Sequence, residues 1–216
     1  MAPRAGLTGI LLVGGASTRF GSPKALARLD GRTLAEIAWA TLGEACDERL
    51  AVGKAADGLE LPFAVLDDRS DIRAPLAGVV AGLRAAQHEL AVVLPVDCPL
   101  VSPHALGLLA RSCADAGVSS LDAPLPGAYR KSALPVLERR LRERELALRG
   151  ALAELEVREV RLDPGLLVNV NTPAELEALQ RSATDARPCG ETTRSRSAPV
   201  PTSDTSTSSS RSTNST

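Results

Sequence analysis

Short runs of apolar residues alternate along the chain with stretches in which apolar side chains recur every three or four positions. The runs are typical of buried strands, because a strand that is covered on both faces needs no polar side. They predict strands at 7–13, 50–53, 63–66, 90–96, 118–121, 128–130 and 157–162. The recurring positions predict helices that begin near 34, 75 and 103, helices over 131–144 and 146–155, and a last helix near 173. This alternation predicts an α/β fold, with a mostly parallel sheet flanked by helices in three α/β/α layers.

Several predicted helices begin at residues that satisfy the free N–H groups of a first turn. Thr33 and Glu36 have the spacing of a capping box. Pro75 suits the first turn of a helix, and Ser102-Pro103 supplies an N-cap followed by a proline. Asp30-Gly31 is typical of a turn. We therefore expect a reversal of the chain at 30–31 and a helix directly after Thr33.

The composition divides the 216-residue chain near residue 181. About half of residues 182–216 are Ser or Thr, and Val200 is the only large apolar residue among them. Such a segment buries too little apolar surface to offset the entropy of ordering it. We expect one folded domain over 1–181 and a disordered Ser/Thr-rich tail over 182–216.

Charge and composition argue against several classes of function. The formal net charge is −1, so no basic surplus favours a nucleic acid, and no apolar run is long enough to span a membrane. The four cysteines form no CxxC pair, and the two histidines lie near no nucleophile motif. A disulfide framework, a zinc site and a serine or cysteine hydrolase are therefore disfavoured. We expect a cytoplasmic protein with no signal peptide and with no nucleic acid or membrane partner.

Polar or glycine-rich segments follow four of the predicted strands and loops. They are the loop 14–24, Asp67-Asp68, Asp97 and Asn169-Val170-Asn171. Open α/β sheets bind their ligands at the carboxyl ends of the strands. We therefore expect these four segments to converge on one edge of the sheet.

The loop 14–24 is the strongest local signal. Gly14-Gly15 follows a strand directly, which lets backbone N–H groups approach an anion. Arg19 and Lys24 add two cations suited to phosphate. The loop lacks the GxxxxGK[ST] and GxGxxG patterns. A phosphate site is the favoured interpretation, and a glycine-rich turn with two solvated basic residues is the alternative.

Further residues extend this candidate site. Asp97 leaves a very apolar strand, where a carboxylate is a natural Mg²⁺ ligand or, alternatively, caps a turn. The polar loop from Asp67-Asp68 through 69–74 into the helix at Pro75 is typical of a wall of a nucleotide pocket, in which either aspartate accepts from ribose or base N–H groups. A surface loop with a charge near a helix N-terminus is an equal alternative. Gly78 and Gly82, one turn apart, allow their helix to approach a neighbouring element or a ligand closely. Asn169 and Asn171 point the same way in an extended segment and suit a metal or an acceptor phosphate, although local turn chemistry explains them better on these residues alone.

Four motifs occur in order along the chain. They are Leu12-Val13-Gly14-Gly15-x-Ser17-x-Arg19-x-Gly21-x-x-Lys24, Pro75-Leu76-Ala77-Gly78, Pro95-Val96-Asp97-Cys98-Pro99 and Asn169-Val170-Asn171-Thr172-Pro173-Ala174-Glu175-Leu176. Together they resemble the molybdenum cofactor guanylyltransferase family of nucleotidyltransferases, over residues 7–181. The resemblance implies a Rossmann-like nucleotidyltransferase fold. It also implies transfer of GMP from Mg-GTP to molybdopterin cofactor, with release of pyrophosphate.

The resemblance assigns roles to single residues. It implies a nucleotide-binding set of Leu12, Val13, Gly14, Gly15, Lys24, Gly53, Asp68, Gly78 and Asp97. It implies catalytic roles for Arg19, Lys24 and Asp97, with Asp97 holding Mg²⁺, and an acceptor or second-metal role for Asn169 and Asn171. The implied partners are GTP, the molybdopterin cofactor and, beyond these, molybdoenzymes or cofactor-delivery proteins.

Three positions depart from the family pattern. Val13 stands where alanine is usual, and Ala74 stands where glycine is usual. Gly53 stands where some members carry an asparagine that contacts the nucleotide, so guanine selectivity is less secure here. A related enzyme that uses CTP or GTP with another small phosphorylated acceptor is therefore one alternative. A GTP-binding module without catalytic activity is another.

Overall fold

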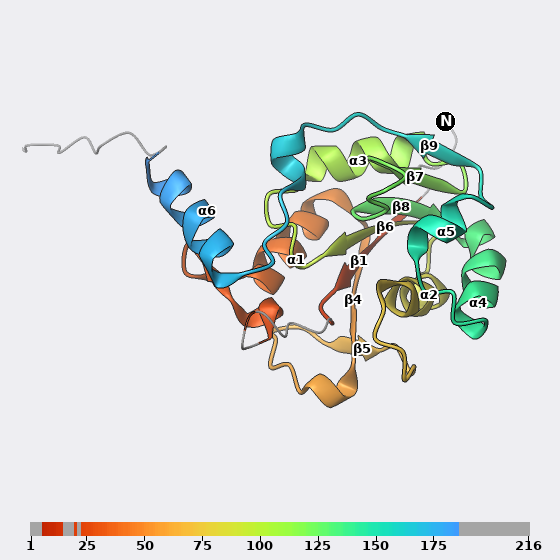
Figure 1. The fold of residues 1–216 in the computed structure, drawn as a ribbon, viewed down its shortest axis with the longest axis horizontal. Coiled ribbons are helices and arrows are strands. Elements are labelled where there is room, and N and C mark those ends of the chain that lie inside the picture. The colour runs from red at the N-terminus through yellow and green to blue at the C-terminus, as the bar shows by residue number, and fades with distance from the viewer. Residues whose placement is uncertain (1–5, 15–19, 21–22, 186–216) are drawn as a thin grey trace, which may run out of the picture.

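The computed structural model describes residues 6–14, 20 and 23–185 of the chain (Figure 1). Gly15, Arg19 and residues 186–216 of the expected tail lie outside the described residues. The last helix, α6, runs over Pro173–Asp185 and so continues four residues past the expected end of the domain.

A seven-stranded sheet forms the centre of the described chain, in the order β5-β4-β1-β6-β8-β7-β9. The strands are β1 (Leu7–Leu12), β4 (Glu48–Gly53), β5 (Val65–Asp67), β6 (Leu90–Pro95), β7 (Ala116–Val118), β8 (Gly127–Arg130) and β9 (Val157–Glu159). Neighbouring strands are parallel except around β8, which is antiparallel to both β6 and β7. The expected mostly parallel sheet is confirmed. The reversed direction of β8 brings the loop that precedes it to the edge where the other strands end.

Helices cover both faces of this sheet. They are α1 (Leu34–Ala45), α2 (Pro75–Ala85), α3 (Pro103–Ser112), α4 (Leu134–Arg142), α5 (Leu148–Leu152) and α6. In Figure 1, α1 and α3 lie on one face, and α2, α4 and α5 lie on the other. The expected three-layer arrangement is therefore confirmed. None of the helices in the described residues is long and apolar enough to cross a bilayer.

The local signals at the start of α1 are confirmed. Asp30 and Gly31 have positive φ angles of 50° and 81°, and they join β2 (Arg28–Leu29) to the antiparallel β3 (Arg32–Thr33) in a tight hairpin. The Thr33 hydroxyl accepts from the Glu36 N–H at 3.1 Å, and the Glu36 carboxylate accepts from the Thr33 N–H at 2.8 Å. The capping box therefore fixes where α1 begins.

Three predicted strands were placed two residues off or made too long. The strand expected at 63–66 lies at Val65–Asp67, where it pairs with the end of β4, and the Phe63 ring instead stacks on Trp39 with ring centroids 4.2 Å apart. The strand expected at 118–121 lies at Ala116–Val118, where pairing to β8 and β9 outweighs the weak strand propensity of Ala116 and Gly117. The strand expected over 157–162 ends at Glu159.

The helices expected over 131–144 and 146–155 are shorter in the structure. The first begins with a 3₁₀ turn at Lys131–Ala133 and continues as α4, which ends before Arg144. Arg144 has a positive φ of 59°, which an α-helix does not tolerate. The second is reduced to the five residues of α5.

Two apolar cores lie on opposite faces of the sheet, because successive strand residues point to opposite sides. In β1, Leu11 belongs to the core beneath α1 and α3, and Ile10 and Leu12 belong to the core beneath α2 and α4. Helix α2 approaches β1 so closely that a Cβ on Gly78 would lie 2.8 Å from Leu12 Cδ2. The expected close approach at Gly78 is therefore a contact with the strand that leads into the candidate site.

Candidate active site

A cavity of about 450 Å³ opens at the carboxyl ends of β1, β4 and β6 and at the start of α2. Its volume lies within the range usual for small-molecule sites. The lining residues are Leu12, Val13, Gly14, Lys24, Val52, Gly53, Lys54, Asp68, Arg73, Ala74, Pro75, Gly78, Pro95, Val96, Asp97, Leu125 and Asn171. All four segments that we expected to converge contribute to it, so the edge predicted from the strand order is the edge that carries the cavity.

One side of the cavity is a polar cluster around Lys24. The Lys24 ammonium donates to Asn171 Oδ1 at 3.1 Å and lies 3.4 Å from Asp97 Oδ2. The side chains of Lys24 and Asp97 are 15% and 26% exposed, so both charges remain accessible from the cavity. The loop that follows β1, the exit of β6 and the segment before α6 thus meet at one ammonium group.

Backbone contacts hold the asparagine segment beside Asp97. The Val170 N–H donates to the Asp97 carbonyl at 2.8 Å, and the Val170 side chain is fully buried in the core beneath α1 and α3. The Asn171 N–H donates to Glu175 Oε2 at 2.5 Å, at the start of α6. Asn171 is therefore fixed on the cavity side of Val170.

Asn169 has a different partner from Asn171. Its Oδ1 accepts from the Cys98 thiol at 2.9 Å, and Asn169 is not among the residues that line the cavity. Burial raises the pKa of the Cys98 thiol, which therefore stays protonated near neutral pH and donates rather than acting as a thiolate nucleophile. The structure brings one of the two expected asparagines to the cavity and places the other against the strand exit.

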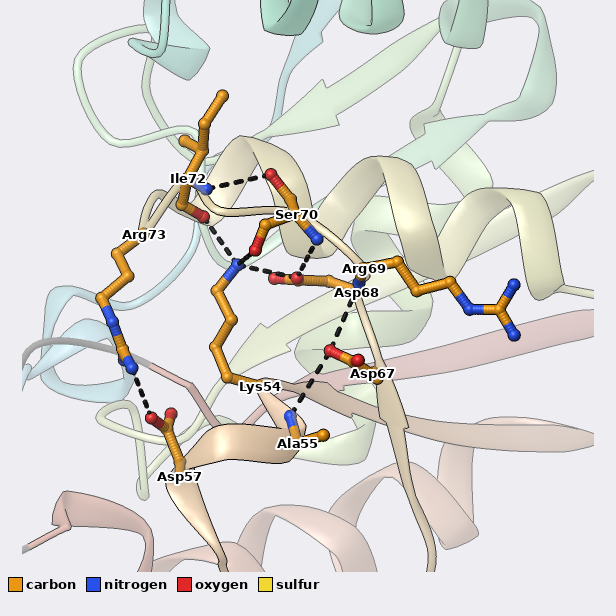
Figure 2. A network of polar contacts seen from close by, with 9 residues as sticks. All are labelled: Lys54, Ala55, Asp57, Asp67, Asp68, Arg69, Ser70, Ile72 and Arg73. Carbon is orange, nitrogen blue, oxygen red and sulfur yellow. Dashed lines mark hydrogen bonds and ion pairs between the residues drawn. The ribbon is translucent and has the colours of Figure 1, made fainter.

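The opposite side of the cavity is a second polar network around Lys54 (Figure 2). The Lys54 ammonium donates to Asp68 Oδ1 at 2.7 Å and to the backbone carbonyls of Ser70 and Ile72. Asp68 is placed beside the strand ends because its N–H donates to the Gly53 carbonyl at 3.0 Å. The expected Asp68 therefore lines the cavity, but as half of an ion pair.

The floor of the cavity is formed by the ends of β1 and β4. A Cβ on Gly14 would meet the Gly53 Cα at 3.4 Å, and a Cβ on Gly53 would meet Val13 Cγ2 at 2.9 Å. The Val13 N–H donates to the Val52 carbonyl at 3.0 Å, which fixes the two strand ends relative to each other. Val13 therefore fills the space that a side chain at position 53 would need.

Two functional candidates were missed by sequence reasoning. Lys54 and Leu125 line the cavity, although neither was predicted to do so, whereas Arg73 lies in the polar loop that was expected to form a pocket wall. One signal for Lys54 is in the composition, because the chain has only three lysines among its 25 basic residues, and this one follows a strand directly. Leu125 had no comparable signal, since its place depends on the reversed direction of β8.

The donor groups of the cavity fit a magnesium ion that arrives with a nucleotide. Mg²⁺ takes one or two carboxylates together with substrate phosphate oxygens and waters. Asp97 offers a partly exposed carboxylate, and Asn171 Oδ1 lies against the same lysine. Within residues 6–14, 20 and 23–185, no cluster of three or more His, Cys, Asp or Glu side chains is placed to hold a metal by itself.

The geometry at this sheet edge can be compared with known proteins. The family described as "MobA-like NTP transferase domain" matches residues 9–160. A molybdenum cofactor guanylyltransferase from Desulfosudis oleivorans is 31% identical over 191 residues, which cover 79% of this chain and 93% of that protein. A probable molybdenum cofactor guanylyltransferase from Chloroflexus aggregans is 34% identical over 199 residues, with 81% and 93% covered. The chain belongs to the molybdenum cofactor guanylyltransferase family.

A solved structure of a similar protein agrees with membership of the molybdenum cofactor guanylyltransferase family. Molybdopterin-guanine dinucleotide biosynthesis protein A from Archaeoglobus fulgidus superimposes with a TM-score of 0.71 at 25% identity, and 82% of this chain and 99% of that chain are covered. The expected nucleotidyltransferase fold is therefore confirmed. As a member of this family, the chain is an enzyme, a nucleotidyltransferase. Nucleotidyltransferases of this family generally use a divalent metal.

Proposed function

We propose that this chain transfers GMP from Mg-GTP to the molybdopterin cofactor, which releases pyrophosphate and forms molybdopterin guanine dinucleotide. The observation that carries the proposal is the cavity at the strand ends, in which Lys24, Asp97 and Asn171 form one cluster. Two relatives that align with this chain over 93% of their own length are named molybdenum cofactor guanylyltransferase and probable molybdenum cofactor guanylyltransferase. Together, these findings support both the reaction class and the acceptor.

The proposed reaction needs charge stabilisation more than it needs a general base. A phosphate oxygen of the acceptor forms a bond to the α-phosphorus of GTP, and the bond from that phosphorus to the bridging oxygen breaks, so pyrophosphate leaves with the electron pair. The acceptor phosphate is already an anion, so no proton has to be removed from it. Positioning and cations then supply most of the rate. This is consistent with a cavity lining, among the described residues, that contains no histidine.

Lys24 is the residue that brings a positive charge to this reaction. Its ammonium is held toward the cavity by Asn171 and Asp97 rather than lying along the surface. In that position it binds phosphate oxygens of the nucleotide and stabilises the negative charge that grows on the departing pyrophosphate. The adjacent strand end at Val13 and Gly14 lets the backbone approach the nucleotide.

Asp97 and Asn171 are the residues that would hold the magnesium ion of Mg-GTP. When bound, that ion supplies charge neutralisation on phosphate oxygens. Asp97 also orients the Lys24 ammonium, so we expect an amide at position 97 to weaken both functions. Asn171 keeps its place through the backbone contacts of Val170 and Glu175.

The three described cysteines support a location for the reaction. Cys46, Cys98 and Cys113 are free thiols, and burial raises the pKa of Cys113 to about 11 and that of Cys46 to about 12. Free thiols of this kind, two of them buried, suit a reducing compartment. We propose that the enzyme acts in the cytoplasm.

Pyrophosphate release tests the proposal directly. The full chain is incubated with molybdopterin cofactor, Mg²⁺ and, separately, GTP, CTP or ATP. We expect turnover with GTP, and little with CTP or ATP. Turnover with CTP but not GTP would contradict the guanylyl assignment and retain nucleotidyl transfer. Tight GTP binding without any pyrophosphate release would favour a non-catalytic module instead.

Two variants test the assigned residues. Lys24→Ala and Asp97→Asn should each lower kcat by about 10²–10³-fold, as expected when a group that stabilises developing charge is lost. Lys131→Ala is the control, because the Lys131 ammonium also makes a partly buried hydrogen bond, in its case to the Ala86 carbonyl, but does not line the cavity. If both site variants retain the kcat of the control, the site has been misplaced.

A further inference from the structure

The segment between β5 and α2, residues 68–74, forms one wall of the cavity, and we call it the wall segment. Three of its residues, Asp68, Arg73 and Ala74, line the cavity. It lies opposite the Lys24 cluster, next to the end of β4 at Gly53. Because Lys24 and Asp97 suit the phosphates under the proposed function, we expect the base and ribose of a bound nucleotide to lie toward the wall segment.

The Lys54 ammonium donates all of its hydrogen bonds to the wall segment. A lysine ammonium has three N–H donors. The Lys54 Nζ lies 2.7 Å from Asp68 Oδ1, 2.5 Å from the Ser70 carbonyl oxygen and 2.8 Å from the Ile72 carbonyl oxygen, so each of its three N–H groups has an acceptor. The Lys54 side chain is only 12% exposed. Although it lines the cavity, this lysine therefore has no donor left for a substrate.

Asp68 depends on this lysine for its place. Its side chain is 6% exposed, and a carboxylate this deeply buried is costly unless it is paired and hydrogen-bonded. Its Oδ1 accepts from Lys54 and also from the Ser70 N–H at 3.0 Å. The second oxygen, Oδ2, takes part in neither contact. Lys54 thus fixes the orientation in which Asp68 lines the cavity.

A second ion pair supports the other end of the wall segment. Arg73 donates to Asp57 Oδ1 at 2.7 Å, and Asp57 ends the 3₁₀ turn that directly follows Lys54. Figure 2 shows the two ion pairs side by side, with the Arg69 side chain pointing away from them. Residues 54–57 therefore hold the wall segment at both ends.

We propose that Lys54 is a positioning residue, which holds Asp68 and the wall segment in the arrangement that binds the nucleoside part of the nucleotide. The inference rests on the proposed function, because it concerns the same cavity. Lys54 acts through Asp68 and the two carbonyls and does not touch the substrate. Its loss should therefore affect recognition of the nucleotide and leave the chemistry at the α-phosphate largely intact.

The kinetic test compares Lys54→Met with Lys131→Met in the full chain. Methionine keeps the length and the apolar stem of lysine, and Lys131 is the matched control outside the cavity. For Lys54→Met we expect the KM for GTP to rise about tenfold or more, because a buried charge loses its partner and the wall segment shifts. The kcat should change by less than about threefold, and the preference for GTP over ATP should fall. Lys54→Arg should restore part of the KM, since it retains a charge beside Asp68.

A double variant tests whether Lys54 acts through Asp68. Asp68→Asn alone should also raise the KM for GTP. If the two residues act as a unit, the variant with both Lys54→Met and Asp68→Asn should have a KM for GTP no higher than that of Lys54→Met alone. Additive effects on KM would contradict a shared role.

Hydrogen exchange in the nucleotide-free chain gives a readout that does not depend on activity. The backbone N–H groups of Ser70 and Ile72 are bonded to side chains within the wall segment, so they report its order. We expect faster exchange across 68–74 in Lys54→Met and unchanged exchange there in Lys131→Met. Wild-type exchange in Lys54→Met would overturn the inference.

The outcomes separate the two proposals. If the wild-type chain releases no pyrophosphate with GTP, the proposed function fails, and the exchange experiment still decides whether Lys54 holds the wall segment. If the wild type is active and Lys54→Met has a wild-type KM, the inference alone fails. Equal losses in Lys54→Met and Lys131→Met would also overturn it, because they would reflect general destabilisation.

Discussion

At the scale of single residues, two lysines in one cavity have opposite surroundings. Lys24 contacts a partly exposed carboxylate and an amide, and its charge faces the cavity. Lys54 is enclosed by one carboxylate and two backbone carbonyls. The same side chain is therefore proposed to bind substrate in one place and to support a wall of the cavity in the other. Only the partner atoms distinguish the two roles.

Position 53 gives a prediction at the same scale. A side chain there would collide with Val13, because a Cβ on Gly53 would lie 2.9 Å from Val13 Cγ2. Gly53→Asn should therefore destabilise the chain by about 1–3 kcal/mol, the usual cost of overpacking. Val13→Ala removes that methyl group, so Val13→Ala with Gly53→Asn should lose less stability than the sum of the two single losses. Urea unfolding of the wild type and the three variants measures this.

The opposite result for position 53 is equally clear. If Gly53→Asn is as stable as the wild type, or if Val13→Ala fails to compensate, the two positions are independent. In that case the departures from the family pattern at 13 and 53 are unrelated. We expect instead that they form one coupled change.

The candidate site was predictable from residues whose chemistry is visible in their type and place. Gly14, Lys24, Asp68, Asp97 and Asn171 follow strand ends or precede a helix cap, and all of them line the cavity. The contacts among them were not predictable. Nothing in the sequence shows that Asp68 pairs with Lys54 or that Asn169 bonds the Cys98 thiol, because these contacts depend on the path of two loops.

At the scale of elements, the capping box of α1 connects the hairpin to the core. Thr33 is buried and ends β3, and Leu34, the first residue of the helix, is fully buried beneath it. The residue before Thr33 also contacts the first turn of the helix, because the Arg32 guanidinium donates to the Glu36 carbonyl at 3.0 Å. The Leu34 N–H also donates to the Ala27 carbonyl at 2.8 Å, so the entry into α1 is fixed by contacts between residues at most seven positions apart.

Thr33→Ala should lower the free energy of unfolding by about 1 kcal/mol, the usual cost of losing an N-cap. Its control is Thr41→Ala, which removes a hydroxyl bonded to a carbonyl inside the same helix.

The hydrogen bonds from the Thr33 backbone and side chain hold the pKa of Glu36 below its ordinary value. The stabilisation from Glu36 is therefore present above pH 4.5 and is lost as the pH falls through the lowered pKa.

The pH dependence is measured as the difference in unfolding free energy between the wild type and Glu36→Gln. The difference should be constant near neutral pH and should shrink below pH 4.5. If it is the same at pH 3 and pH 7, the carboxylate form of Glu36 does not stabilise the box. A Thr33→Ala variant as stable as Thr41→Ala would argue against the cap itself.

The elements with strong periodicity were predictable, and the short ones were less so. β1, β6 and α2 are long and apolar enough for the sequence to place them within a residue or two. β7 contains only Ala116, Gly117 and Val118, so its pairing to neighbours decides its place. The direction of β8 was also beyond the sequence, because a four-residue strand carries no signal that separates parallel from antiparallel pairing.

At the scale of the whole molecule, the sheet separates two cores that share strands but few side-chain contacts. Val101 belongs to the core beneath α1 and α3, and Val79 belongs to the core beneath α2 and α4. Each is at most 3% exposed. The two faces therefore contribute to stability through separate sets of packed side chains.

Val79→Ala and Val101→Ala should each lower the free energy of unfolding by about 2 kcal/mol, from the methyl groups removed and the cavities left. Because the two residues lie on opposite faces, the double variant should lose the sum to within about 0.5 kcal/mol. Chemical denaturation of the four proteins tests this. A double variant that departs from the sum by more than 1 kcal/mol would show that the sheet transmits strain between its faces.

The contact between Lys24 and Asn171 has a consequence for the order of synthesis. It joins residues 147 positions apart, so the two groups leave the ribosome at very different times. At about 5–20 residues per second, Asn171 emerges roughly 4–15 s after Asp97. During that interval the growing chain already contains β1, β4, β5 and β6 but lacks the amide that holds Lys24 toward the cavity. Under the proposed function, the contact that orients Lys24 toward the nucleotide therefore forms only after β1, β4, β5 and β6 have been synthesised.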